Sequence, residues 1–191
     1  MQVIAFNGSP RLKGNTQMAL EIVLEELRAN GIGGELVNIC ESDILGCKAC
    51  GACGRTKDRR CERADDDLNS HIAKMCAADG ILLGSPTYFG NMTGQMKCFI
   101  DRAGFVARAN GDLFKDKVGA AVAVNRRAGA LATFNAMNDF FLIGQMIVVG
   151  STYWNVATAL KPGDMEADKE GVETMRNLGR NMASLLKKMH R

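Results

Sequence analysis

The sequence has no uninterrupted apolar segment long enough to cross a membrane, and its first residues lack the apolar core of a secretory signal. It also has no long run of basic residues, because 21 Asp and Glu balance 24 Lys and Arg to a net charge of +3. Proteins that bind nucleic acid usually show a denser cluster of positive charge. We therefore expect a cytoplasmic protein with no nucleic-acid partner and no membrane partner.

The chain also lacks the even number of cysteines that a secreted disulfide framework would use, since it contains seven. Without an export signal, we expect these thiols to be reduced or bound to a metal. Internal repeats and linkers are absent too, and 191 residues is the length of one ordinary domain. The expectation is a single domain over residues 1–191, with a cysteine-rich insertion at about residues 40–63.

Two well-known phosphate-binding motifs are missing from the first loop, residues 7–17. Gly14-Asn15-Thr16 has no lysine in the position that a P-loop requires. Gly8-Ser9-Pro10 breaks the Gly-x-Gly-x-x-Gly spacing of a dinucleotide-binding turn at its second glycine. An anion bound in this loop is therefore expected to be a monophosphate.

The same loop nevertheless carries the features of an anion site. It joins an apolar strand predicted for Val3–Phe6 to a helix predicted from Thr16, and a helix N-terminus favours negative charge. Glycines in the loop allow close backbone approach, and polar or cationic side chains surround them. The alternative is a plain turn with an N-cap at Asn15 or Thr16. The candidate phosphate-binding residues are Ser9, Arg11, Gly14, Asn15, Thr16 and Gln17.

The rest of the chain alternates between strand and helix patterns. Strands are expected at residues 3–6, 35–39, 81–84, 118–124 and 146–149, and helices from residue 16 and at 68–76, 93–102, 131–142 and 172–186. This alternation predicts an α/β protein with a doubly wound, five-stranded parallel sheet and helices on both faces. By analogy with the flavodoxin-like fold, we expect the strand order 2-1-3-4-5. The loops at 7–17, 40–61, 84–93, 125–129 and 150–156 should then lie along one edge of the sheet.

Residues 40–63 follow neither period, and a long structureless loop in a compact domain is usually functional. Within it, Cys47, Cys50 and Cys53 recur at every third position, and Cys61 follows after seven more residues. Thiolates at this spacing can bind three corners of a [4Fe-4S] cluster, with the later cysteine at the fourth. Zinc is a weaker alternative, because four-cysteine zinc sites prefer two separated Cys-x2-Cys pairs. Reduced or disulfide-linked thiols without a metal are a third.

Three further features are interpreted as structural. Asp65-Asp66-Asp67 is expected to cap the helix that begins near residue 68. His71 is expected on the surface of that helix. Cys40, Cys76 and Cys98 fall on apolar positions or helix faces and are expected to be small buried residues.

Several motifs together resemble one protein family. The segments Gly8-Ser-Pro-Arg11, Gly14-Asn-Thr16, Gly84-Ser-Pro-Thr-Tyr-Phe-Gly90 and Gly94-Gln-Met-Lys97 are similar to the NADPH-dependent FMN reductase family of the flavodoxin superfamily. The cysteine motif resembles that of the iron-sulfur flavoproteins, the branch in which such a motif after the second strand holds a [4Fe-4S] cluster. The resemblance spans nearly the whole chain. It departs from the branch in the long gap before Cys61.

The resemblance implies that FMN lies against the loops after the third and fourth strands, where flat or aromatic side chains and backbone donors can contact its ring. Alternatively, the aromatic residues fill the core and the arginines are solvated. Tyr153 and Trp154 are expected either to cover the flavin or to lie in a subunit contact. The candidate residues are Pro86, Thr87, Tyr88, Phe89, Gly90, Asn91, Asn125, Arg126, Arg127 and Gly129.

The implied function is an FMN-dependent oxidoreductase that passes electrons between FMN and a [4Fe-4S] cluster, with NAD(P)H or reduced ferredoxin as the electron donor. The resemblance also implies a homodimer or homotetramer. The alternatives are an NAD(P)H-dependent FMN reductase without a cluster, and a non-enzymatic electron carrier or redox sensor. The basic residues expected to offset the negative charge of the cluster are Lys48, Arg55, Lys57, Arg59 and Arg60.

Overall fold

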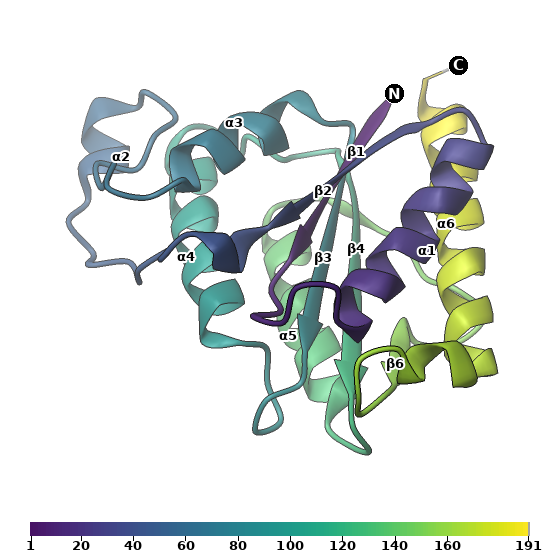
Figure 1. Cartoon of the computed structure of the whole chain (residues 1–191). Coiled ribbons are helices and arrows are strands. Elements are labelled where there is room, and N and C mark those ends of the chain that lie inside the picture. Colours follow the sequence, from purple (N-terminus) through teal and green to yellow (C-terminus); the bar gives the residue numbers. More distant parts are fainter. Residues whose placement is uncertain (191) are drawn as a thin grey trace.

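The computed structural model describes residues 1–190 and shows a parallel sheet enclosed by helices (Figure 1). The sheet runs in the order β2-β1-β3-β4-β5, with β6 beside β4, and all pairs are parallel. The predicted flavodoxin-like strand order is therefore confirmed. The strands are β1 (Gln2–Asn7), β2 (Gly33–Asn38), β3 (Gly80–Pro86), β4 (Val118–Asn125), β5 (Ile147–Val148) and β6 (Val156–Thr158).

Helices cover both faces of this sheet (Figure 1). On one face lie α1 (Asn15–Ala29) and α6 (Lys169–Met189), and on the other lie α3 (Leu68–Ala77), α4 (Gly94–Ala109) and α5 (Ala130–Ile143). Each face has its own apolar core, and successive residues of β1 point alternately into the two cores. None of the helices within residues 1–190 has the length and apolarity that a membrane crossing requires.

The two central strands explain the continuous apolar runs in the sequence. All eight residues of β4 are buried, and in β3 only Pro86 is partly exposed. A parallel strand with helices on both faces has no solvated side, so it shows no polar alternation. These strands are therefore well predicted from sequence, although β3 extends two residues further than expected.

The fifth strand is split, which the sequence pattern did not predict. β5 pairs with the first residues of β4, whereas β6 pairs with its last three. Between them the chain leaves the sheet, and the Asn155 side chain bridges the gap by donating to Val149 O (3.3 Å). The predicted strand at 146–149 is correspondingly short, and the predicted loop at 150–156 ends inside β6. A strand of three residues is too short for its period to be recognised.

The cysteine-rich segment is less irregular than predicted, and it lies in a different place. It contains a 3-10 helix (Ile39–Glu41) and the short helix α2 (Ala52–Thr56), which projects at the left of Figure 1. Asn110, just after α4, donates to Cys53 O (3.3 Å) and accepts from the Arg59 N–H (2.9 Å). Since α4 begins at the carboxyl edge of the sheet and runs away from it, the cysteines have left the edge where residues 40–61 were expected.

The residues around α3 extend one prediction and correct another. The N–H of Leu68 donates to Asp66 Oδ1 (3.2 Å), and the buried Asp66 side chain also pairs with Arg102. The aspartate run is therefore structural, as predicted, but it does more than cap a helix. His71 is not a surface residue, since it is 7% exposed and packs edge-on against Phe6 and Phe99. Burial lowers the pKa of His71, so the neutral imidazole is the form that packs here.

Three cysteines outside the motif lie at the margin of the core. Cys40, Cys76 and Cys98 are half-buried and pack against the core under α3 and α4, rather than being buried as predicted. Burial raises the pKa of Cys40 to about 11. This thiol therefore stays protonated near neutral pH and is a poor nucleophile.

Close packing of α6 on α1 depends on a glycine. A Cβ atom added at Gly179 would lie 2.6 Å from Glu26 Cβ and 2.8 Å from the carbonyl oxygen of Val23. The second contact is with the backbone of α1, so a change of rotamer cannot relieve it. The two helices can approach as they do only because residue 179 has no side chain.

Gly179→Ala is therefore expected to destabilise the fold, although alanine is the better helix former. Overpacking typically costs about 1–3 kcal/mol, whereas the helix preference for alanine returns at most roughly 1 kcal/mol. Gly94→Ala at the start of α4 is the matched control, because nothing lies within 4 Å of its added Cβ. Urea unfolding should give a lower free energy of unfolding for Gly179→Ala than for Gly94→Ala. Equal values would contradict the close helix packing.

Candidate functional site

The loop between β1 and α1 folds back over the start of the helix. The Ser9 hydroxyl accepts the Arg11 N–H (3.2 Å), and the Ser9 N–H donates to Asn7 Oδ1 (3.1 Å). Ser9 and Thr16 are nearly buried, at 4% and 2% exposure. The first N–H groups of a helix have no intrahelical acceptor and carry partial positive charge, so this end of α1 favours an anion.

Two of the predicted phosphate-binding side chains instead shape this loop. Asn15 Nδ2 donates to Lys161 O (2.8 Å), and Asn15 Oδ1 accepts from the Gly163 N–H (3.0 Å). Gln17 Oε1 accepts from the Lys13 N–H (2.9 Å). The N-cap position belongs to Gly14, not to Asn15 or Thr16. The amide of Asn15 therefore ties the loop to the segment after β6.

The loop after β3 forms a tight turn that displays an aromatic side chain. Tyr88 and Asn91 exchange two backbone hydrogen bonds (2.8 and 3.1 Å) around Phe89 and Gly90. Phe89 and Gly90 both have positive φ, at 49° and 76°, as a type I′ turn requires. Phe89 is fully exposed and Tyr88 is 41% exposed, so these aromatic residues do not fill the core.

The loop after β4 packs directly on that turn. Gly129 has a φ of 87°, and a Cβ added there would lie 3.3 Å from Thr87 Cγ2 and 3.4 Å from Gly90 Cα. A glycine at this position therefore lets the two loops approach each other. On the other side of the loop, Asn125 is hydrogen-bonded to the Thr158 hydroxyl (3.1 Å). The loop after β3, the loop after β4 and the end of β6 thus form one continuous wall.

These loops enclose a cavity of about 170 Å³ at the carboxyl edge of the sheet. Its lining residues are Ser9, Arg11, Gly14, Asn15, Thr16, Pro86, Thr87, Tyr88, Val124, Asn125, Arg126, Ala159, Leu160 and Pro162. Most of the predicted residues are therefore brought together. The predicted residues outside the lining are Gln17, Phe89, Gly90, Asn91, Arg127 and Gly129.

Sequence reasoning missed the part of the wall that follows β6. Ala159, Leu160 and Pro162 line the cavity, and Asn15 holds this segment in place through Lys161 and Gly163. The only signal in the sequence was the Pro162-Gly163 pair, which marks a turn but carries no ligand-binding chemistry. Val124 was predicted as a strand residue, and its place in the wall follows from its position at the end of β4.

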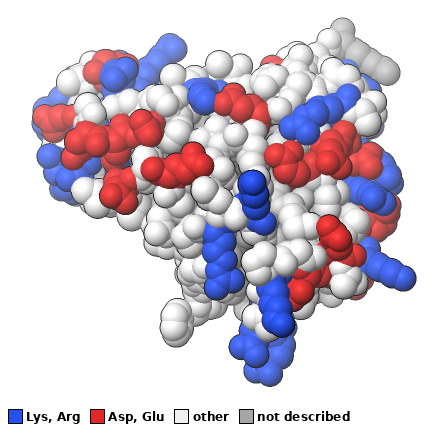
Figure 2. All heavy atoms as spheres, in the orientation of Figure 1, with Lys and Arg blue, Asp and Glu red and all other residues white. Residues whose placement is uncertain are grey.

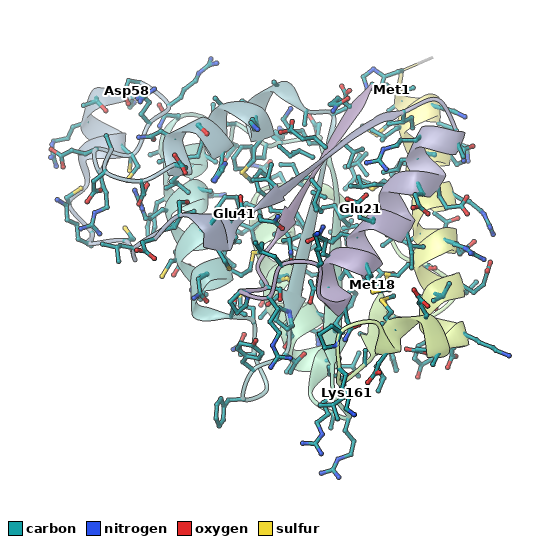
Figure 3. All side chains as sticks on the ribbon, in the orientation of Figure 1. Met1, Met18, Glu21, Glu41, Asp58 and Lys161 are labelled. Atoms are coloured by element: carbon teal, nitrogen blue, oxygen red, sulfur yellow. The ribbon has the colours of Figure 1, made fainter. Side chains whose placement is uncertain are left out.

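The surroundings of this cavity suit an anionic ligand. Arg11, Arg126, Arg127 and Lys161 are all exposed. Figure 2 shows Lys and Arg side chains gathered at the lower end of the molecule, where Figure 3 labels Lys161. Within the part of the chain described, the buried Thr87 Oγ1 in the cavity wall has no hydrogen-bond partner.

A second cavity, of about 160 Å³, lies under the cysteine motif. All four predicted cysteine ligands line it, together with Arg102, Phe105 and Val106 of α4. Cys47 and Cys50 are exposed, whereas Cys53 and Cys61 are half-buried. Burial raises the pKa of Cys53, and the neighbouring cysteines raise it further. The structure therefore brings Cys61 to the same cavity as the other three despite the long gap in sequence.

Both backbone groups of Cys61 are held by one side chain of α3. Its N–H donates to Asn69 Oδ1 (2.7 Å), and its carbonyl accepts from Asn69 Nδ2 (2.9 Å). Arg102 donates to the sulfur of the same cysteine. Between residues 1 and 190, no three Cys, His, Asp or Glu side chains converge closely enough to bind a single metal ion. The four cysteines therefore line a common cavity without converging on a single ion position.

The basic residues of the cysteine segment do not face the cavity. Lys48, Arg55, Lys57, Arg59 and Arg60 are all exposed and do not line it. The cation that does line it, Arg102, lies 41 residues beyond Cys61. The sequence does contain a signal for a buried Arg102. This residue falls three positions after Phe99, on the face of α4 that is otherwise apolar.

Comparison with known proteins identifies the family. The family model of NADPH-dependent FMN reductase matches residues 1–161. The chain is 37% identical to an iron-sulfur flavoprotein of Methanocaldococcus jannaschii over 98% of both chains. It is 34% identical to the iron-sulfur flavoprotein of Methanosarcina thermophila over 97% of this chain and 95% of that one.

A solved structure agrees with the fold. The flavodoxin, WrbA-like protein from Agrobacterium tumefaciens superposes with a TM-score of 0.67 at 19% identity, over 98% of this chain and 97% of that chain. Together with the strand order and the position of the first cavity, these likenesses lead to one conclusion. The chain belongs to the NADPH-dependent FMN reductase family, in its iron-sulfur flavoprotein branch, and is an FMN-dependent oxidoreductase with a flavodoxin-like fold.

Proposed function

We propose that this oxidoreductase passes electrons between FMN and a [4Fe-4S] cluster held by Cys47, Cys50, Cys53 and Cys61. The observation that carries the proposal is that all four cysteines line one cavity, although seven residues separate the fourth from the third. Bound FMN supplies two-electron hydride chemistry together with single-electron release, which a one-electron cluster requires. The single domain of residues 1–191 would hold both groups.

The first cavity would hold FMN by its phosphate end and its ring. Ser9, Thr16 and the N–H groups at the start of α1 would donate to the phosphate, and Arg11 would add charge. Pro86 and Tyr88 would flank the ring, where Thr87 Oγ1 offers an unpaired polar atom. Asn15 and Gln17 would act indirectly, since their side chains hold the loop.

The second cavity fits a cluster better than it fits zinc. A tetrahedral zinc ion binds sulfur at about 2.3 Å, which holds its four sulfurs roughly 3.8 Å apart. Within the described residues no group of three ligands is that compact, whereas the cavity that the four cysteines line together with α4 measures about 160 Å³. An eight-atom cluster needs such a hollow, and four thiolates are the usual ligands of one.

NAD(P)H or reduced ferredoxin is the electron donor that we propose. Arg126 lines the first cavity and Arg127 is exposed beside it, and guanidinium groups bind phosphates well. Steady-state assays with NADH, NADPH and reduced ferredoxin would identify the donor. If the protein contains no cluster and still reduces free FMN or a quinone, a plain FMN reductase would be favoured.

We also propose that the functional unit is a homodimer or homotetramer. The two cavities share no lining residue. Arg102 lies eight residues into α4, about 12 Å from its start at the rise of an α-helix. Leu142 and Ile143 on α5 are each 62% exposed and Phe105 on α4 is 60% exposed, so apolar surface is available for a second copy. The cysteines of one copy would then approach the flavin of its neighbour.

FMN affinity should fall when Ser9→Ala and Thr16→Ala are combined, because each removes a donor to the phosphate. A hydrogen bond to a charged group contributes about 1.5–3 kcal/mol, so each loss should weaken binding roughly tenfold to hundredfold. Flavin fluorescence titration of the apoprotein would measure the dissociation constant. Ser184→Ala, at an exposed position of α6, is the control. Unchanged affinity in the double variant would exclude this phosphate site.

Cys50→Ser should abolish cluster binding and leave FMN bound, because Cys50 lines only the second cavity. Iron and sulfide analysis after anaerobic reconstitution should give about four of each per chain for the wild-type protein. Cys76→Ser, outside the cavity, should match the wild-type values. Stoichiometric zinc in the wild type, or iron uptake unaffected by Cys50→Ser, would refute the cluster.

Light scattering at micromolar concentration should report two or four chains per particle. Leu142→Lys together with Ile143→Lys should shift the particle toward one chain, since charged side chains would oppose burial of this face. Glu170→Lys, at an exposed position on α6, is the matched control for added charge. A wild-type protein that stays monomeric under these conditions would rule out the proposed assembly.

A further inference from the structure

Arg102 is a charged residue in a place where charge is costly. It is 1% exposed and lies among apolar residues of α4, such as Phe99 and Val106. Burying a guanidinium group requires partners for its charge and for all of its N–H groups. In this structure those partners come from the cysteine segment and from the residues that precede α3.

Each nitrogen of Arg102 donates to at least one acceptor. Nε and Nη2 both donate to Cys61 Sγ, at 3.4 and 3.3 Å. Nη1 donates to Leu45 O (3.2 Å) and Nη2 to Arg63 O (3.1 Å). Nη1 also donates to Asp66 Oδ2, and Nη2 lies 3.2 Å from Asp66 Oδ1, so the two hydrogens of Nη2 are shared among three acceptors. The Asp66 side chain is 3% exposed. The guanidinium therefore faces a sulfur atom on one side and a carboxylate on another.

The contact with sulfur is directional. The Nε and Nη2 edge of a guanidinium offers two parallel N–H groups, a geometry that suits an anionic acceptor such as a thiolate. A neutral thiol is a weak acceptor and would be a poor partner for a buried charge. Because Cys61 lines the cavity proposed for the cluster, its sulfur would be a ligand and an anionic acceptor at once.

The net charge around the cavity also matters. One-electron reduction adds one negative charge to a cluster and its four thiolates, so a nearby cation stabilises the reduced form. Arg102 contacts the sulfur directly, whereas Asp66 lies behind the guanidinium. Lys48, Arg55, Lys57, Arg59 and Arg60 are exposed to solvent, which screens their effect. Arg63 is paired with Asp65 (3.2 Å) and does not line the cavity.

We propose that Arg102 is a positioning residue that raises the reduction potential of the cluster through its two hydrogen bonds to Cys61, and that Asp66 holds Arg102 in place while partly opposing its charge. The inference rests on the cluster proposed above. Hydrogen bonds to the sulfurs and local charge are two of the properties that set cluster potentials. The pair therefore adjusts how readily electrons move between the cluster and the flavin.

The test is the cluster potential, measured by anaerobic redox titration with the EPR signal of the reduced cluster as the readout. Arg102→Lys keeps the charge but loses the two-pronged contact, so the potential should become more negative. Asp66→Asn removes the opposing charge and should make the potential more positive. Arg108→Lys, on the exposed side of α4, is the control and should leave it unchanged.

A purely structural role would reduce the amount of cluster bound in both variants without moving its potential in opposite directions.

If either single variant fails to fold, Arg102→Gln combined with Asp66→Asn avoids a lone buried charge. The cluster potential of this double variant should lie below that of the wild type. Iron and sulfide content of the wild type is measured first. A wild type without a cluster overturns the proposed function and this inference together, whereas a cluster whose potential is the same in all variants overturns this inference alone.

Discussion

Parallel pairing of the strands is the constraint on which the rest of this structure depends. Each strand must return to the same starting edge through a crossover, so helices cover both faces and every strand ends at one edge. The loops after β1, β3 and β4 therefore meet there, with the segment after β6 as the fourth side. Four separated stretches of sequence thus meet in one site at this edge of the sheet.

The cysteine segment also follows a strand, but it does not stay at this edge, because it packs against α4. It leaves the sheet after β2, and contacts from Asn69, Arg102 and Asn110 hold it beside the far half of that helix. Buried ion pairs such as Arg102–Asp66 bring little net stability, because desolvation offsets the attraction between the charges. Their directionality is what suits them to orient a segment that has almost no apolar core of its own.

Sequence reasoning succeeded where the signal was local. The apolar runs of β3 and β4, the glycine-containing first loop and the cysteine spacing all lie within short stretches of sequence. The predicted strand order is confirmed. Most residues of the predicted flavin site line one cavity, and the four cysteines line another. It failed where the cause was a distant contact. The place of His71 depends on Phe6 and Phe99, the role of Arg102 depends on Cys61, and Leu160 reaches the first cavity through hydrogen bonds that Asn15 makes to its neighbours.

The visible absorption spectrum of the anaerobically purified protein shows whether one chain carries both a flavin and a cluster. We expect the two resolved bands of oxidised flavin on top of a broad absorbance from the cluster. Removal of FMN should leave the broad absorbance in place, because the two cavities share no residue. A spectrum that contains flavin bands alone, after reconstitution with iron and sulfide, would show that the chain holds no cluster.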